Sequence, residues 1–514
     1  MIVPVLQLSE VGLVADRPPH RMVPNALSRA VNVRFDYTGV RTAGAFENSA
    51  ELSLNDQLID LYILPDGSIL LCGLAALYRY YPSSGSVSQI SSGTFTGSLI
   101  DRWLGGIFNN FFVLTNGKDV PVYYDYNGPG NAAAVPGWMS GRRARCIRPL
   151  VYHLVALGVI ISGTPDYRRV WWSSSAEPNT MPTTWDTSLY TADSGEVTLP
   201  NGNDPIIDGL QLGSSFVIYT REQTWLMRYI GGTQVFAFSQ LSNQSGLLAP
   251  GCVVHLQGLG HFAVTRNDVV LVSDTITSVA EGRIRRWLFD AMDAVSYHTC
   301  RVLHLPNFKE VLVFFPARGS GYPNRAAVWN YGTNVWSTLE FDRVCRSVAY
   351  KGPTIYSEIY TIDSDTSQCD ANDGVLCDDT PASYESTEVL LALSGPLSLS
   401  EYRSGSGGNA AVEREGLAFV GPDEQDEWRF KRVLGLRLDA TGPDGAVITV
   451  DYGIRMSHQS PTQWLGSADY ILGTTEEAQF EAVGRFLAFR FRWSDPDVRL
   501  LGYYYDVHSL GEAF

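Results

Sequence analysis

Short apolar runs separated by glycine, asparagine and aspartate recur along this chain, and their spacing constrains the fold more than any other feature. In the first unit, the runs 58–67, 69–73 and 77–81 follow one another, and a Pro-Asp-Gly turn closes the first. Apolar runs of this length between turn-forming residues are typical of β-strands. Similar units follow at a spacing of roughly 45 to 50 residues. The six units span residues 58–81, 103–125, 146–185, 207–240, 253–289 and 299–341.

This period is typical of the four-stranded blade of a β-propeller, in which each blade covers the apolar face of its neighbour. In the last unit, the strands 328–331 and 335–336 flank a Gly-Thr-Asn turn and predict a tight hairpin. The 48 Gly, 26 Pro, 12 Trp, 26 Tyr and 22 Phe agree with many strands and turns. We predict an all-β fold with a propeller of about six blades; irregular β-sandwiches are the alternative.

One segment inside the repeat series has helical periodicity. Residues 276–295 place Ile284, Trp287, Leu288 and Met292 at helical spacing. Ser278 precedes them as a candidate N-cap. We predict a short helical insertion packed on the propeller.

The composition changes after Val344. Between Asp363 and Glu427 the chain carries 15 acidic and two basic residues, so this region holds most of the formal charge of −16. Strands resume at 428–438, 446–450, 486–493 and 500–507, partly with arginine alternating with apolar residues, as in a sheet with one solvated face. We predict a C-terminal β domain of sandwich type that acts as a platform.

The predicted organisation therefore has three parts. Residues 1–50 form an N-terminal arm and strands that pack on the platform. Residues 51–343 form the propeller-like domain, and residues 344–514 form the C-terminal β domain with its acidic loop region at 363–427. A chain of 514 residues is long enough for two or three such domains.

Charge and cysteine content exclude several classes of protein. An excess of 54 acidic over 38 basic residues argues against tight wrapping of phosphate backbones, so we expect only transient, non-specific contact with double-stranded DNA. Seven widely spaced cysteines do not form a secreted disulfide framework, and we expect synthesis in a reducing cytoplasm. The N-terminus lacks a basic leader and the apolar run 154–161 is too short for a membrane span, so we predict neither export signal nor membrane anchor.

Several motifs occur in an order that points to one family. The stretch 23–44 combines a Pro-Asn-Ala turn, an Asn-Val-Arg-Phe strand and a Gly-Val-Arg turn, and residues 171–178 with Trp185 form a Trp-Ser…Pro…Trp blade. Further matching stretches are 208–219, 246–250, 260–268, 485–491 and 501–503. In this order they resemble the tail nozzle proteins of short-tailed bacteriophages (podoviruses), also called tail tubular protein B.

The resemblance implies a structural virion protein rather than an enzyme, with no cofactor. Nozzle proteins of this family form a hexameric ring at the distal end of the tail, docked to the head-to-tail adaptor and flanked by tail fibres or tailspikes. The genome leaves through the centre of the ring, with the propellers outside and the other β domains nearer the axis. The implied location is the tail of the virion, after synthesis in the host cytoplasm.

The acidic region gives a hypothesis about the bore. An acidic wall would repel the duplex and keep it centred over a Debye length of about 8 Å. The candidate residues are Asp363, Asp365, Asp370, Asp373, Asp378, Asp379, Glu424, Asp426 and Glu427. The alternative is that these carboxylates only solvate an exposed loop.

Candidate metal and catalytic motifs are weak. Asp363, Asp365 and residues 370–374 bring oxygen ligands together, but they lack the glutamate that closes a calcium loop, and an acidic turn is the alternative. Cys369 and Cys377 have no partner pair for zinc. The sequence has no Gly-x-Ser-x-Gly elbow, phosphate-binding glycine loop or His-Glu-x-x-His. We therefore expect no metal site and no catalytic residues, and we interpret His261 as a core histidine.

Two further clusters have alternative interpretations. Glu177 beside Trp171, Trp172 and Trp185 could form a sugar-stacking site with a carboxylate acid, although tryptophans in a blade usually belong to the core. The basic cluster Arg142, Arg143 and Arg145 is either a solvated turn or a docking patch for an acidic neighbouring subunit. The functional alternatives to a nozzle are a carbohydrate-binding or glycan-cleaving propeller and another virion component, such as a fibre base.

Overall fold

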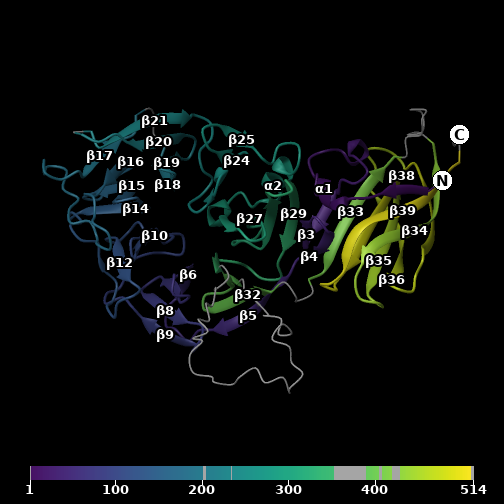
Figure 1. The fold of residues 1–514 in the computed structure, drawn as a ribbon, viewed down its shortest axis with the longest axis horizontal. Coiled ribbons are helices and arrows are strands. Elements are labelled where there is room, and N and C mark those ends of the chain that lie inside the picture. Colours follow the sequence, from purple (N-terminus) through teal and green to yellow (C-terminus); the bar gives the residue numbers. More distant parts are fainter. Residues whose placement is uncertain are drawn as a thin grey trace, which may run out of the picture.

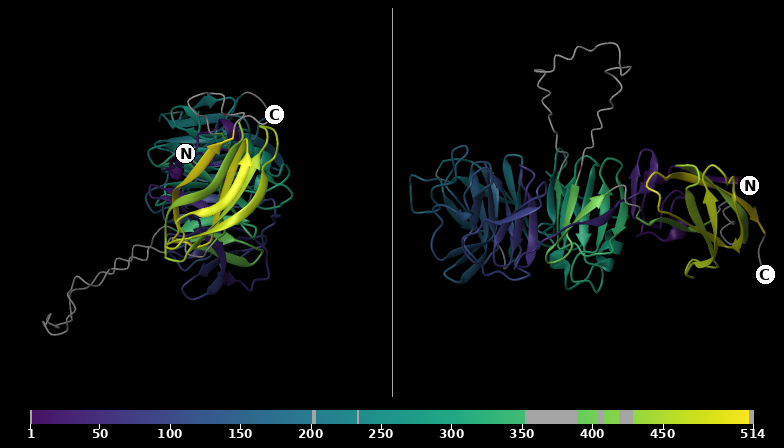
Figure 2. Two further views of the ribbon diagram at one scale, coloured as in Figure 1. Left: turned by 90° about the vertical axis from the view of Figure 1, so that its right-hand side faces the viewer. Right: turned by 90° about the horizontal axis from the view of Figure 1, so that it is seen from below.

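The structure is a computed structural model that describes residues 2–200, 204–232, 234–351, 389–403, 408–418 and 429–510. Strands dominate these residues, and they form two parts that lie side by side along the longest axis of the molecule (Figures 1 and 2). One part is a ring of four-stranded sheets, which is a β-propeller. The other consists of two larger sheets to which both ends of the chain contribute. The all-β class and the propeller are thus confirmed.

The first three blades follow one another in the chain, each an antiparallel four-stranded sheet. Blade 1 is β6 (Leu58–Ile63), β7 (Ile69–Gly73), β8 (Leu77–Tyr81) and β9 (Ser86–Gln89). Blade 2 is β10 (Leu104–Phe108), β11 (Phe111–Thr115), β12 (Val122–Asp125) and β13 (Ala133–Ala134). Blade 3 is β14 (Arg142–Leu150), β15 (His153–Ile161), β16 (Thr164–Trp172) and β17 (Gly195–Thr198).

The next three blades continue the same order. Blade 4 is β18 (Ile206–Leu212), β19 (Ser215–Thr220), β20 (Thr224–Tyr229) and β21 (Phe236–Ser242). Blade 5 is β22 (Val253–Leu256), β23 (Gly260–Val264), β24 (Val269–Val272) and β25 (Ile276–Ser278). Blade 6 is β26 (Arg301–Leu305), β27 (Glu310–Phe315), β28 (Arg325–Asn330) and β29 (Val335–Glu340). All six predicted units are blades, and the predicted hairpin is β28–β29 with Asn334 at φ 56° in its turn.

A seventh blade combines segments from both ends of the propeller sequence. Its strands are β30 (Ser347–Lys351), β31 (Val389–Leu393), β32 (Ser398–Arg403) and β5 (Ala45–Glu51). The N-terminal strand β5 pairs antiparallel with β32 and so joins the two ends of the ring. The expectation of about six blades is therefore corrected to seven in the described chain. The repeat pattern missed this blade because its strands are not consecutive in the sequence, and 37 residues separate β30 from β31.

The seven blades surround a common axis. The first strand of each blade is its innermost strand, and neighbouring inner strands such as β14 and β18, β22 and β26, and β30 and β6 contact each other. All inner strands run the same way, so each begins at one end of the axis. We call this end the first mouth of the propeller and the other end the second mouth. The connections between the second and third strands of a blade also lie at the first mouth.

The two larger sheets pack face to face beside the propeller. One has the order β3 (Val33–Asp36), β4 (Gly39–Thr42), β39 (Arg499–Ser509), β34 (Lys431–Thr441) and β37 (Ala478–Gly484), with β1 (Ile2–Val5) paired to β39. The other contains β2 (Arg29–Val31), β33 (Ala410–Leu417), β38 (Phe486–Trp493), β35 (Val447–Arg455) and β36 (Gln463–Ile471). Between them, the Phe491 and Tyr503 rings lie 4.9 Å apart, and Tyr452 stacks on Phe480 at 4.3 Å.

The second of these sheets is continuous with blade 6. The outer strand β29 pairs in parallel with β2 through Val31 and Thr338, and β2 pairs with β33. Blade 6 and the C-terminal strands therefore form one nine-stranded sheet. The propeller and the C-terminal part are joined by backbone hydrogen bonds as well as by the chain itself.

Helices are short in the described residues. They are α1 (Leu8–Val11), α2 (Arg285–Ala291) and 3₁₀ turns at Pro19–Arg21 and Tyr297–Thr299. The helix predicted over 276–295 is confirmed only for its middle: residues 276–278 form β25, and Ser278 donates to Asp268 instead of capping α2. Strand pairing with β24 outcompetes helix formation at these residues. No described helix is both long and apolar enough to cross a membrane.

Candidate functional site

Buried ion pairs connect different blades near the axis of the propeller. Asp60 on β6 is almost completely buried and accepts hydrogen bonds from Arg102, with an Nε to Oδ2 distance of 3.0 Å. Arg301 at the start of β26 donates to the same carboxylate from blade 6, with Nη2 3.1 Å from Oδ1. Burial, and next the charge of Arg301, lower the pKa of Arg102. One carboxylate thus binds guanidinium groups from two other parts of the ring.

A second buried pair joins blades 3 and 4. Arg148 on β14 donates to Asp208 on β18 through Nε and Nη2, at 2.9 and 2.8 Å. The backbone N–H groups of Gly209 and Gly251 also donate to this carboxylate, at 2.8 and 3.0 Å. Burial acts to raise the pKa of Asp208, but Arg148 and the backbone donors hold it below its usual value. This pair joins adjacent blades, whereas the Arg301–Asp60 pair joins blades 6 and 1 across the inner side of blade 7.

A cavity of about 420 Å³ lies at the first mouth, above the buried pairs. Its wall comes from residues that precede or begin inner strands and from turns between second and third strands. Arg102, Pro205 and Pro250 belong to the first group, and Gly117 and Arg221 to the second. The cavity therefore exists only because several blades converge at the axis.

The cavity carries positive charge that its own carboxylates do not balance. Lys118 lies 3.7 Å from Asp101, and Arg102 is bound by Asp60 beneath the floor. Arg145 stacks over the Tyr167 ring at 5.1 Å, whereas Arg221 is exposed. Within the described chain, neither Arg145 nor Arg221 has a carboxylate within ion-pair distance. This part of the mouth is suited to bind an anionic group.

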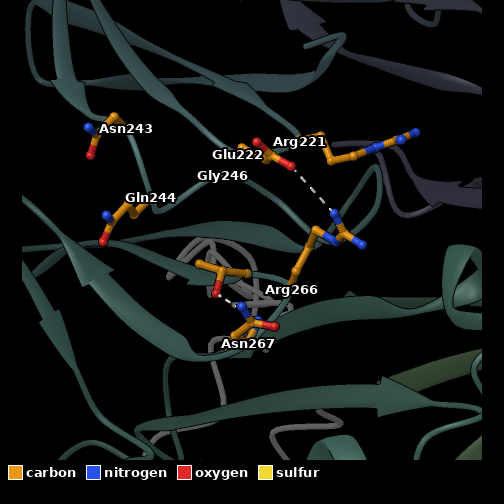
Figure 3. Close-up of a pocket in the computed structure, with 8 residues that line it drawn as sticks. Arg221, Glu222, Asn243, Gln244, Gly246, Arg266 and Asn267 are labelled. Atoms are coloured by element: carbon orange, nitrogen blue, oxygen red, sulfur yellow. Dashed lines mark hydrogen bonds and ion pairs between the residues drawn. The ribbon is translucent and has the colours of Figure 1, made fainter.

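A second groove of about 490 Å³ lies across blades 4 and 5 (Figure 3). Arg221 lines both this groove and the cavity at the first mouth. In this groove Arg266 pairs with Glu222 at 3.6 Å. Arg221 points away from that pair in Figure 3. The amide side chains Asn243, Gln244 and Asn267 also line the groove. Amides can both donate to and accept from a polypeptide backbone.

The predicted basic cluster divides between two faces of β14, because side chains alternate along a strand. Arg142 pairs with Glu196 at 2.5 Å and lies over the Trp171 ring. Arg143 donates to the backbone oxygen of Lys118 at 3.0 Å. Of the three, Arg145 alone lines the cavity at the first mouth. The three arginines therefore do not form one patch.

The predicted acidic residues lie outside the described residues. These are Asp363, Asp365, Asp370, Asp373, Asp378, Asp379, Glu424, Asp426 and Glu427. The calcium and thiol hypotheses at residues 363–377 lie there as well. Their position on a bore therefore stays a prediction. In the described part of the chain, no group of three or more His, Cys, Asp or Glu side chains could hold a metal ion.

The tryptophans considered for sugar stacking are core residues. Trp171 and Trp185 are completely buried, and the Trp171 indole donates to the Trp185 backbone oxygen at 3.0 Å. Glu177 is exposed, but Trp171, Trp172 and Trp185 are all buried and offer its carboxylate no open indole face. His261 is also buried: its Nδ1 lies 2.9 Å from the Tyr219 hydroxyl and its Nε2 lies 2.9 Å from the Gln211 carbonyl. The interpretation of His261 as a core residue is confirmed.

The charged residues at the axis were not among the predicted site residues. Asp60 and Asp208 each interrupt an apolar run, in Leu-Ile-Asp-Leu and Ile-Ile-Asp-Gly. A carboxylate inside such a run must have a buried partner, because an isolated buried charge is costly. That pattern could have identified both positions, but no local feature identifies their arginine partners.

No protein-family model matches the chain, and no curated protein does. Among solved structures, the WD40 β-propeller domain of Doa1 matches with a TM-score of 0.38 and 8% identity, covering 70% of this chain and 97% of that one. The extracellular domain of the putative hybrid two component system BT4673 from B. thetaiotaomicron matches with a TM-score of 0.41 and 10% identity, covering 79% and 45%. The chain is an all-β protein built on a β-propeller.

Proposed function

We propose that this chain is a structural, non-enzymatic subunit of a ring in the tail of a short-tailed bacteriophage, a nozzle through which double-stranded DNA leaves. The resemblance described above suggests the ring, with six copies, and its partners: the head-to-tail adaptor, and tail fibres or tailspikes. The two facing C-terminal sheets would be the sandwich-like platform of that ring. The protein would be made in the host cytoplasm and act in the virion.

The observation that carries the proposal is the nine-stranded sheet that runs from blade 6 into the C-terminal part. A subunit of a DNA conduit must transmit force between its domains without bending. Interfaces between separate domains usually allow relative motion. Here a backbone-bonded sheet replaces such an interface, which favours a rigid building block.

A ladder of ion pairs follows the same sheet. From blade 6 outward, Glu340 lies 3.2 Å from Arg325 and 3.9 Å from Arg29. Arg29 then pairs with Glu413 at 2.9 Å, and Glu413 with Arg490 at 2.7 Å. The ladder ends at Asp451, which binds Arg490 at 3.6 Å and Arg492 at 2.7 Å. Alternating charges on neighbouring strands favour one register across the junction.

The axis of the single propeller is not the proposed conduit, because the buried pair of Arg301 and Asp60 reaches across the inner side of blade 7 and narrows the space at the axis. The duplex would pass through the centre of the ring of copies. A subunit with this role needs a stable shape and docking surfaces, and it needs no reactive side chain. The buried tryptophans and histidine described above serve packing.

Electron microscopy of purified phage particles tests the proposal. We expect a sixfold ring at the distal end of the tail, into which this chain fits with its propeller on the outside. The ring should also be absent from particles that lack the gene. A chain that occurs in no particle, or that is purified as a monomer and turns over a glycan, would refute the proposal. A position at the base of a fibre would instead support the other virion role.

A further inference from the structure

The first mouth combines positive charge with an apolar wall. Arg145 and Arg221 are its two cations without a carboxylate partner in the described chain. Around them lie apolar side chains from four blades: Leu104, Ile160, Pro205, Ile207 and Pro250. A ligand that fits this surface needs acidic groups as well as apolar groups between them.

This combination decides between classes of ligand. Duplex DNA is too stiff to enter a recessed cavity of about 420 Å³ between loops. Free phosphate would satisfy the guanidinium groups and leave the apolar wall uncovered. An extended acidic polypeptide can place carboxylates on the arginines and apolar side chains on the wall, and the amides of the adjoining groove can bind its backbone.

The chain itself has a segment of this composition. Residues 352–388 contain nine acidic residues and no lysine or arginine. Within them, Asp373-Gly-Val-Leu-Cys-Asp-Asp379 places two apolar residues between carboxylates. The connection joins the end of β30 to the start of β31, so its two anchors, Lys351 and Val389, lie at the second mouth. From there, a chain of 37 residues can reach up to roughly 60 Å as a hairpin.

We propose that the first mouth binds the acidic segment 352–388 of a second copy. The segment starts at the opposite end of the propeller from the first mouth, and the buried pair of Asp60 and Arg301 narrows the axis between them. A neighbouring copy is therefore the source that fits the geometry. Such a contact joins two different surfaces, and repeated contacts of this kind close into a ring when the rotation between copies allows it. The proposal rests on the proposed ring and deepens it by naming a contact between copies. Residues 363–379 would then act between subunits and not on the wall of the bore.

A binding assay with the full-length chain tests the contact. The receiver carries Asn in place of Asp363, Asp365, Asp370, Asp373, Asp378 and Asp379, so that its own segment does not compete. The probe is a fluorescent peptide of residues 363–385 with Ser in place of Cys369 and Cys377. We expect saturable binding in fluorescence anisotropy that weakens at least about tenfold in a receiver with Arg145→Glu and Arg221→Glu. Binding should also weaken as salt increases.

Controls identify the cause of any loss. Arg286→Glu changes the same charge at an exposed position of α2, outside the cavity, and should leave binding unchanged. A peptide with Asn at its aspartates should not bind. Inorganic phosphate at millimolar concentration should not compete beyond the effect of its ionic strength. Equal binding to the receiver with and without the two arginine changes, or no binding at all, would overturn the proposal.

Sedimentation of the full-length variants tests whether the contact joins copies. The Asp-to-Asn chain lacks the segment charge, and the Arg145→Glu, Arg221→Glu chain lacks the mouth charge, so each alone should associate less than the wild-type chain. An equal mixture should form a complex of two copies, because one contact is restored. Self-association of both variants at the wild-type level would overturn the proposal. A sixfold ring in particles of either variant would also overturn the proposed contact, but it would leave the nozzle function intact. Peptide binding by a chain that is absent from particles would support the contact and overturn the nozzle function.

Discussion

Replacing Asp60 by asparagine should destabilise the propeller strongly, because this one carboxylate is the ion-pair partner of two buried arginines. The side chains of Asp60, Arg102 and Arg301 are 2%, 6% and 10% exposed. Water therefore cannot solvate the two guanidinium groups once the carboxylate is removed. Removing one partner of a buried ion pair costs about 3–5 kcal/mol. The propeller has roughly 300 residues, and at about 2.1 cal/mol/K per residue a loss of about 4 kcal/mol lowers the melting temperature by about 6 °C.

Differential scanning calorimetry of Asp60→Asn and of a matched surface variant measures this effect. Asp290→Asn removes the partner of Arg286 in an exposed pair and should move the transition by about 1 °C or less. A chain with Asp60→Leu alone should be destabilised as well, and adding Arg102→Met should recover part of the stability that it loses, because fewer charges then stay buried without a partner. A decrease below about 2 °C for Asp60→Asn would instead mean that Arg102 and Arg301 are solvated in solution and do not depend on this carboxylate.

Three further predictions concern other parts of the molecule. Burial lowers the pKa of His261 to about 4, whereas a histidine in the unfolded chain takes up a proton near pH 6.5. The free energy of unfolding should therefore fall as the pH decreases from about 6.5 to about 4. Urea titrations across this range should show a smaller decrease for His261→Phe. Glu413→Gln removes a carboxylate shared by Arg29 and Arg490. Amide hydrogen exchange should become faster in β2 and β33, while the inner strands of the propeller stay protected. Unchanged exchange in β2 and β33 would argue against the ladder of ion pairs. Trp171→Ala leaves a cavity in blade 3 and should lower the free energy of unfolding by about 3–5 kcal/mol. If Trp171 instead bound sugars, the variant would lose glycan affinity with little change in its denaturant midpoint.

Local patterns were enough to locate most of the propeller. The inner strands of blades 1 to 6 lie where the apolar runs and turns predicted them, because a buried strand needs continuous apolar residues and a reversal needs glycine or asparagine. The outer strands β9, β13 and β17 lie outside the predicted units, and β25 lies in the segment predicted as a helix. The hairpin at Asn334 follows the same logic. The C-terminal strands β34, β35, β38 and β39 were also visible in the sequence, although β36 and β37 were not.

Long-range pairing was not visible in the sequence. Blade 7 joins β5 to β32 across about 350 residues of chain, and no periodicity links two such segments. The same holds for Val31 and Thr338, whose pairing makes one sheet of blade 6 and the C-terminal strands. Helix α2 begins later than its periodicity predicted because the residues before Ala280 pair as a strand.

The site depended on tertiary structure most of all. The sequence presents Arg142, Arg143 and Arg145 as one basic cluster, but strand alternation and the neighbouring loops place only Arg145 at the first mouth, where it meets Arg221 from another blade. The all-β class, six of the blades and the local concentration of acidic charge follow from the amino-acid sequence, because they depend on residues that are close together in the chain. The closure of the ring, the buried ion pairs and the unbalanced cations depend on the three-dimensional fold, because ion pairs and cavities form between segments that are far apart in the chain.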